Sequence, residues 1–367
     1  MSTIPGYSSA ATSGYGARGQ ILTGATQARE RLDTLTLQAG SGRVADTFGG
    51  LAAGASTSLA LRPDLTRIEG WQANIAAAQG RMDVTLTALD QISGIASDFR
   101  ARIADLNGLN AGTVDSVAAA ARDALRQVAG LLNTRQAGQY VFAGQDVANP
   151  PVPQADDILS SGFATQIATA VTGLGTNGAA ATIAATMATA TSNAAGTSPF
   201  SPAQSQPAAT LRDQSATVSV GEGQHVETGV AASANAEATS SGGSTTGSYM
   251  RDILRGLATL GAMDGAQVDT PGFAALAQDV RAGLESAVTA LGVDAGLLGN
   301  RQAALGDQAD RLGATATTLR TRLAGAEDVD MAETLSALSL AQTRLQASYQ
   351  LLAGLPSLSL VKFLPAG

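Results

Sequence analysis

Five segments of this sequence repeat apolar residues every seventh position, in alternating steps of four and three. In chain order, the segments span residues 21–39, 61–103, 114–132, 284–323 and 331–352. The most regular of them carries Leu284, Leu291, Leu298, Leu305, Leu312 and Leu319. This spacing places a narrow apolar stripe along one side of an α-helix, which is typical of coiled-coil seams. Because no helix can bury its own stripe, each predicted helix needs a partner helix.

The segment between the third and fourth repeats has a different composition. Residues 136–210 contain no Lys or Arg and are rich in Ala, Thr, Ser and Gly. A short strand is predicted at 140–142, before the first prolines. A β-hairpin is predicted at 218–230, where β-branched residues alternate with polar ones around a Gly-Glu-Gly turn at 221–223. No pattern in residues 151–210 defines a fold.

We therefore predict a mainly α protein in which both chain ends form a long antiparallel helical hairpin or coiled-coil bundle. A small β-hairpin and a polar central insertion complete the predicted fold. The expected domains are a terminal coiled-coil domain (1–45 with 327–367), a helical core domain (46–149 with 246–326) and a central insertion domain (150–245).

The composition disfavours several classes of function. With 22 basic and 30 acidic residues, the net charge of −8 opposes binding to nucleic acid or to an anionic membrane surface. Cysteine is absent and His225 is the one histidine, which excludes disulfides and thiolate sites and disfavours a histidine metal site. The first 19 residues lack the cationic start and apolar block of a secretory signal.

Two features suggest chemistry, and for both the structural interpretation is preferred. Residues 14–19 match G-x-G-x-x-G, but a dinucleotide site needs a strand before the glycines, and only Ser-, Ala- and Thr-rich sequence precedes them. We expect a flexible leader there. His225 has Glu222 and Glu227 nearby, but without a nucleophile or second imidazole it is expected to be a solvated turn residue. We predict no enzyme activity, catalytic residue, cofactor or metal.

Polar residues near the later repeats also have structural interpretations. Carboxylates favour the amino end of a helix, so the acidic run at 327–330 is expected to cap the fifth helix. Gln302 and Gln342 interrupt apolar stripes, as residues that fix register or partner number do.

Three motifs outside the insertion match one known family. Residues 328–333 read Asp-Val-Asp-Met-Ala-Glu before the last apolar stripe, 140–144 match Y-[LV]-F-[AG]-G, and 41–44 match S-G-[KR]-[RVI]. With the five repeats, they resemble the bacterial flagellin family and its hook-associated relatives over 1–149 and 246–367. Residues 45–50 depart from the Asp-Asp-Pro turn usual there. The resemblance implies paired chain ends in the inner tube of an axial structure, and export through the flagellar type III channel to the extracellular flagellum.

The closing residues 355–364 look more like the S-L-S-L-[LV]-x-[YF]-L ending of hook-associated protein 3 than like a flagellin ending. The resemblance therefore favours a subunit of the hook–filament junction, with the filament subunit flagellin as the alternative. A cytosolic coiled-coil regulator would share the repeats and the acidic charge, but would not need a long polar insertion between its helices.

The stripes of the first and fifth helices form the expected assembly interface. Its residues are Ile21, Ala25, Ala28, Leu32, Leu35, Met331, Leu335, Leu338, Leu345, Tyr349 and Leu352. The implied partners are copies of this chain, hook-associated protein 1, flagellin and an export chaperone, with no nucleic acid and no membrane.

Overall fold

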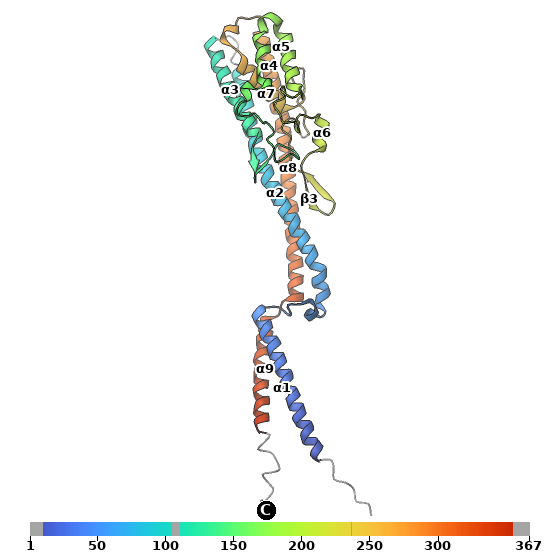
Figure 1. Ribbon diagram of the computed structural model, residues 1–367. Helices are drawn as coiled ribbons and strands as arrows, with labels where there is room; N and C mark the ends of the chain where they lie inside the picture. The colour runs from blue at the N-terminus through green and yellow to red at the C-terminus, as the bar shows by residue number, and fades with distance from the viewer. Residues whose placement is uncertain (1–9, 105–110, 236, 355–367) are drawn as a thin grey trace, which may run out of the picture. The chain divides into compact units, whose positions relative to one another are not determined.

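The computed structural model describes residues 10–104, 111–235 and 237–354 (Figure 1). The side chains of residues 10–18, 21 and 104 lie outside that description. The chain forms two compact units, Met1–Ile68 with Ala314–Gly367 and Glu69–Gly313. Helices α2 (Gly54–Ala104) and α8 (Phe273–Glu327) contribute residues to both units.

The first unit pairs the two ends of the described chain. Helix α1 (Ala10–Ser41) lies beside α9 (Met331–Gly354), and a 3-10 helix, η1 (Phe48–Leu51), precedes α2 (Figure 1). Two backbone hydrogen bonds join the segment just after α1 to the residues that link α8 to α9. The Val44 N–H donates to the Glu327 carbonyl at 2.7 Å, and the Val329 N–H to the Gly42 carbonyl at 3.0 Å. Since the end of one helix meets the start of the other, α1 and α9 are antiparallel.

The second unit contains an antiparallel pair formed by residues 69–104 of α2 and 273–313 of α8. The Gln302 amide of α8 donates to the Asp83 carboxylate of α2, so this polar interruption does set a cross-helix contact. Both helices bury their seven-residue repeats, with exposures of 0–3%. The buried repeat positions are Ile75, Met82, Leu89, Ala96 and Ile103 of α2, with Leu284, Leu291, Leu298 and Leu305 of α8.

Helix α7 (Tyr249–Ala262) lies at the centre of a helical cluster in this second unit. It packs against α3 (Ala111–Leu132), α4 (Gly162–Thr172) and α5 (Leu174–Thr191). Every residue of α7 through Gly261 is buried. Gly261 allows the close approach to α3, because a Cβ there would lie 3.0 Å from Cγ of Arg122. Shorter elements, η2 (Ile158–Ser160), α6 (Ala208–Asp213) and η3 (Gly265–Gln267), lie between these helices in the chain.

The central insertion is therefore substantially helical. Helix α4 buries Phe163, Ile167 and Val171 in steps of four, while the inward face of α5 is made of Thr182, Thr186 and Thr189. Threonine hydroxyls bond to carbonyls of the preceding turn, as the Thr189 hydroxyl does to the Ala185 carbonyl at 3.0 Å. Small and threonine side chains thus fill a helical interface whose composition resembles a loop.

Two small antiparallel hairpins carry the strands. The predicted hairpin is confirmed, with β3 (Thr217–Gly221) paired to β4 (Gln224–Glu227). The strand predicted at 140–142 is wrong in extent. Strand β2 is only Gln139–Tyr140, paired with β1 (Arg135–Gln136), while Val141 and Phe142 are buried beyond it. The Arg81 guanidinium of α2 donates to the carbonyls of Tyr140 and Val141, each at 3.1 Å, and so takes the place of ladder partners.

The mainly helical fold, the pairing of the chain ends and all five predicted helices are confirmed. The expected leader at 14–19 is wrong, because these residues lie within α1. The three-domain division stays a prediction, and the closing segment 355–364 lies outside the described residues.

Candidate functional site

The facing sides of α1 and α9 bury a seven-residue repeat. On α1, Ala25 and Leu35 are 8% and 3% exposed, and Ala28 and Leu32 are half-buried. On α9, one row of buried or half-buried residues recurs in steps of four and three: Thr334, Leu338, Ala341, Leu345, Ser348 and Leu352. Because α1 packs along α9, this face of α9 is covered within the chain.

The predicted α9 stripe is wider than the face that α1 covers. Leu338, Leu345 and Leu352 belong to the covered face, whereas Met331, Leu335 and Tyr349 are 41%, 51% and 51% exposed. The seam that two paired helices share is narrower than an apolar band about 100° wide. The exposed members remain open to another molecule, and the assembly role of the predicted residues stays a proposal. Ile21 lies in α1, but its side chain is outside the described part.

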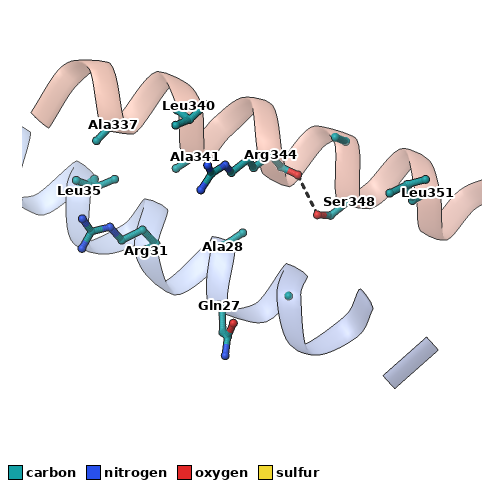
Figure 2. Close-up of a pocket in the computed structure, with 12 residues that line it drawn as sticks. Gln27, Ala28, Arg31, Leu35, Ala337, Leu340, Ala341, Arg344, Ser348 and Leu351 are labelled. Atoms are coloured by element: carbon teal, nitrogen blue, oxygen red, sulfur yellow. Dashed lines mark hydrogen bonds between the residues drawn. The ribbon is translucent and has the colours of Figure 1, made fainter. Parts of the chain in front are cut away.

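An open groove runs between α1 and α9 on the other flank of α9. It encloses about 610 Å³ and is shown in Figure 2. Its walls are Gly24, Gln27, Ala28, Arg31 and Leu35 from α1, with Ala337, Leu340, Ala341, Arg344, Ala347, Ser348 and Leu351 from α9. Arg31 and Arg344 place two guanidinium groups at this groove, and neither has an acidic partner within the described ranges. The groove is therefore apolar and small-residue-lined, with unneutralised positive charge.

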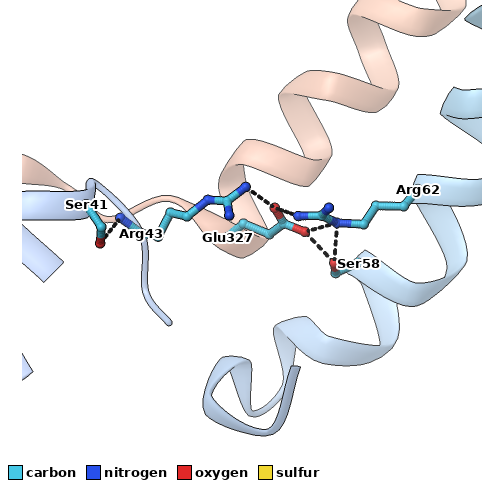
Figure 3. Close-up of polar contacts among 5 residues, drawn as sticks. All are labelled: Ser41, Arg43, Ser58, Arg62 and Glu327. Carbon is cyan, nitrogen blue, oxygen red and sulfur yellow. Dashed lines mark hydrogen bonds and ion pairs between the residues drawn. The ribbon is translucent and has the colours of Figure 1, made fainter. Parts of the chain in front are cut away.

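Glu327 joins three segments of the first unit at the end of α8 (Figure 3). Its carboxylate receives two hydrogen bonds from Arg62 of α2, Nε to Oε1 at 2.7 Å and Nη2 to Oε2 at 2.6 Å. The Ser58 hydroxyl also donates to Oε1. Arg43, in the segment after α1, places Nη2 3.7 Å from Oε2. Glu327 is 5% exposed, so this carboxylate is a buried anion held by two cations.

These partners favour the charged form of Glu327. Hydrogen bonds from Arg62 and Ser58, aided by the positive charges of Arg62 and Arg43, lower the pKa of Glu327 to about 2 against the opposing effect of burial. The carboxylate therefore stays ionised across the neutral and mildly acidic range, and it fixes the ends of α2 and α8 beside the segment that links α1 to α2.

The acidic run at 327–330 has two roles rather than one. Asp330 caps α9 as predicted, since its carboxylate accepts from the N–H groups of Ala332 at 2.9 Å and Glu333 at 3.1 Å. Glu327, in contrast, is the last residue of α8 and binds arginines. The sequence reasoning missed this site, although Arg62 and Ser58 lie one helical turn apart and form an i, i+4 pair that faces one partner.

The other residues that the sequence suggested for a cofactor or catalytic site are not arranged as one. Residues 14–19 are helical, which is incompatible with the glycine turn of a dinucleotide site. His225, Glu222 and Glu227 are all exposed around the β3–β4 hairpin. Over the described ranges, no three His, Asp or Glu side chains gather as metal ligands. No helix there combines the length and apolar character needed to cross a membrane.

Comparison with known families matches both paired regions. The model of the bacterial flagellin N-terminal helical region matches residues 13–146, and that of the C-terminal helical region matches residues 282–364. No curated protein sequence matches the chain. The two family matches together cover more than half of the chain, and they contain most of α1 and α8 and all of α9.

Both matched regions are helical regions of structural, self-assembling proteins, so this chain is of the class of structural assembly subunits. This chain belongs to the bacterial flagellin family. It is accordingly a non-enzymatic, extracellular component of the bacterial flagellum, and proteins of this family self-assemble into flagellar axial structures.

Proposed function

We propose that this chain is the structural subunit of the hook–filament junction and assembles with copies of itself through α1 and α9. The observation that carries the assembly proposal is the unfinished burial of this helix pair. Helix α9 leaves Met331, Leu335, Leu340, Tyr349 and Leu351 between 41% and 63% exposed. Exposed apolar residues on both flanks of one helix of a structural subunit favour contact with other protein surfaces.

The placement at the junction rests on the sequence after α9. Residues 357–364 read Ser-Leu-Ser-Leu-Val-Lys-Phe-Leu, which resembles the ending of hook-associated protein 3. A junction subunit would contact copies of itself, hook-associated protein 1 on the hook side and flagellin on the filament side. Export through the flagellar type III channel, with an export chaperone, belongs to the same proposal.

A deletion strain tests the placement. Because the junction precedes the filament, cells without this chain should complete their hooks and release unpolymerised flagellin into the medium. Immunogold labelling of the complemented strain should give one band at the hook end. Labelling along the whole filament, or a deletion strain that exports no flagellin, would refute the junction and support the filament subunit.

A further inference from the structure

Helix α1 carries a second stripe on the face opposite α9. Leu22 and Leu37 are 56% and 70% exposed, and Thr26, Glu30 and Asp33 between them are exposed as well. At 3.6 residues per turn these five residues share one side of the helix, centred about 140° from the row formed by Ala25, Ala28, Leu32 and Leu35. We refer to Leu22, Glu30, Asp33 and Leu37 as the acidic ridge: two leucines flanking two carboxylates.

The groove between α1 and α9 carries side chains that complement those of the acidic ridge. Arg31 and Arg344 supply positive charge, and Leu340 and Leu351, which line the same groove, are 51% and 63% exposed. Small side chains such as Ala28 and Ala341 form much of the remaining wall and leave room for the side chains of an incoming helix (Figure 2). Two cations at one groove repel each other unless an anion lies between them.

We propose that the acidic ridge of one copy inserts into the groove of a neighbouring copy, with Glu30 and Asp33 facing Arg31 and Arg344. This inference rests on the proposed function and names the contact through which that assembly occurs. The ridge cannot reach the groove of its own chain, because it lies on the side of α1 that points away from α9. Leucines at both surfaces would supply buried apolar area, while the charges set register and exclude other registers.

The contact is heterologous, since two different surfaces of the subunit meet. Such contacts propagate around a ring or along a helical array, whereas a two-fold contact stops at a dimer. A subunit that carries the ridge and the groove on opposite sides of one helix pair therefore has the geometry that an axial structure requires.

Charge exchange tests the pairing. The ridge-reversed chain is Glu30→Arg with Asp33→Arg, and the groove-reversed chain is Arg31→Glu with Arg344→Glu. Each alone should enter sheared flagella of the deletion strain at least about tenfold less than the unchanged chain, because like charges then meet. Co-expression of the two, or all four changes in one chain, should restore incorporation. Arg322→Glu, an exposed charge reversal on α8 in the same unit, is the matched control and should assemble normally.

Cysteine cross-linking gives a second measurement on a clean background, because the chain contains no cysteine. A chain with Asp33→Cys and Arg344→Cys should form a ladder of linked copies after oxidation of assembled flagella. Closure within one chain is prevented because Asp33 faces away from α9, and a disulfide needs Cα atoms within about 7 Å. The single variants should stay unlinked.

The outcomes separate this inference from the proposed function. Full incorporation of the reversed chains, failure of the four-change chain while the unchanged chain assembles, or absence of the ladder would overturn the ridge-in-groove contact alone. Failure of the unchanged, folded chain to enter any flagellar structure would overturn the assembly function itself.

Discussion

Replacing Glu327 with glutamine tests whether the buried carboxylate stabilises the first unit. The substitution keeps the size and the acceptor oxygen but removes the charge that Arg62 and Arg43 neutralise. The pKa of Glu327 falls from 4.5 to about 2, a preference for the ionised folded form worth at most about 3–4 kcal/mol. Since the Arg62 and Arg43 side chains are 44% and 48% exposed, solvent screening reduces this value. We expect a loss of about 1–2 kcal/mol at pH 7.

The pH dependence has a definite sign. A carboxylate whose pKa is lower in the folded protein stabilises it above the unfolded pKa, and this contribution disappears as pH falls through the folded pKa. The difference in stability between the unchanged chain and Glu327→Gln should therefore be full above about pH 5 and shrink from there towards pH 2.

Thermal unfolding followed by circular dichroism at 222 nm measures both effects. Glu327→Gln should lower the melting temperature of the first unit by about 3–8 °C at pH 7, and by much less near pH 2.5. Asp64→Asn is the matched control, because Asp64 pairs with Arg67 at the exposed surface of the same unit and should contribute little. Equal melting temperatures at pH 7, or a difference that persists at pH 2.5, would refute the role assigned to Glu327.

Two further predictions concern α9 and the buried arginine of α7. Deleting residues 331–367 should leave the second unit folded, with its α-helical signal intact, but should abolish incorporation into flagella; incorporation of the truncated chain would contradict assembly through α9. Arg255 is 1% exposed and binds Asp279 of α8 at 2.9 Å and the Ser244 carbonyl at 2.6 Å. Arg255→Met leaves the Asp279 carboxylate buried and unpaired, so we expect a loss of about 3 kcal/mol in denaturant unfolding. Arg255→Met with Asp279→Leu should recover much of that loss, and an equally unstable double variant would argue against the ion pair as the cause.

The long helices could be predicted because their apolar residues follow one rule over many turns. Leu284 to Leu305 recur every seventh residue, and each is at most 2% exposed in the structure. A seam of this kind predicts a partner helix as well as the helix that carries it. The pairing of the chain ends followed from the same pattern, since the stripes at both ends needed covering.

Helix α7 was not predicted because its apolar repeat is short. Met250, Ile253, Leu257 and Leu260 follow the three-and-four spacing, but the repeat stops after two heptads, and the polar face that carries Arg251 is buried as well. Helix α5 was missed for a different reason, because its inward residues are mainly threonines whose composition resembles that of a linker. In both cases packing against neighbouring helices completes what the local pattern only suggests.

The candidate site was predictable only in part. Heptad spacing identified the α1–α9 face, but it could not say how much of each stripe the partner helix covers. The covered part of a stripe depends on how far the neighbouring helix extends around it. In this pair Leu335 and Tyr349 remain exposed. The Glu327 cluster joins residues far apart in the chain, and only the backbone path around Gly42 and Val329 brings Arg43 towards that carboxylate.

The two helix pairs of this chain differ in what they bury. The α2–α8 pair of the second unit buries Ile75, Met82 and Leu89 completely. The α1–α9 face instead relies on alanines and on leucines of which Leu35 is buried and the others are only partly covered. Hydrophobic stabilisation scales with the apolar area removed from water, so the terminal pair gains less from its own contact. Contacts that copies make with the paired state stabilise it further by mass action. The small side chains of the α1–α9 face limit the apolar area that the pair buries by itself. They also leave a groove and exposed leucines for a neighbouring copy. We therefore infer that ordering of the terminal helices and assembly are coupled.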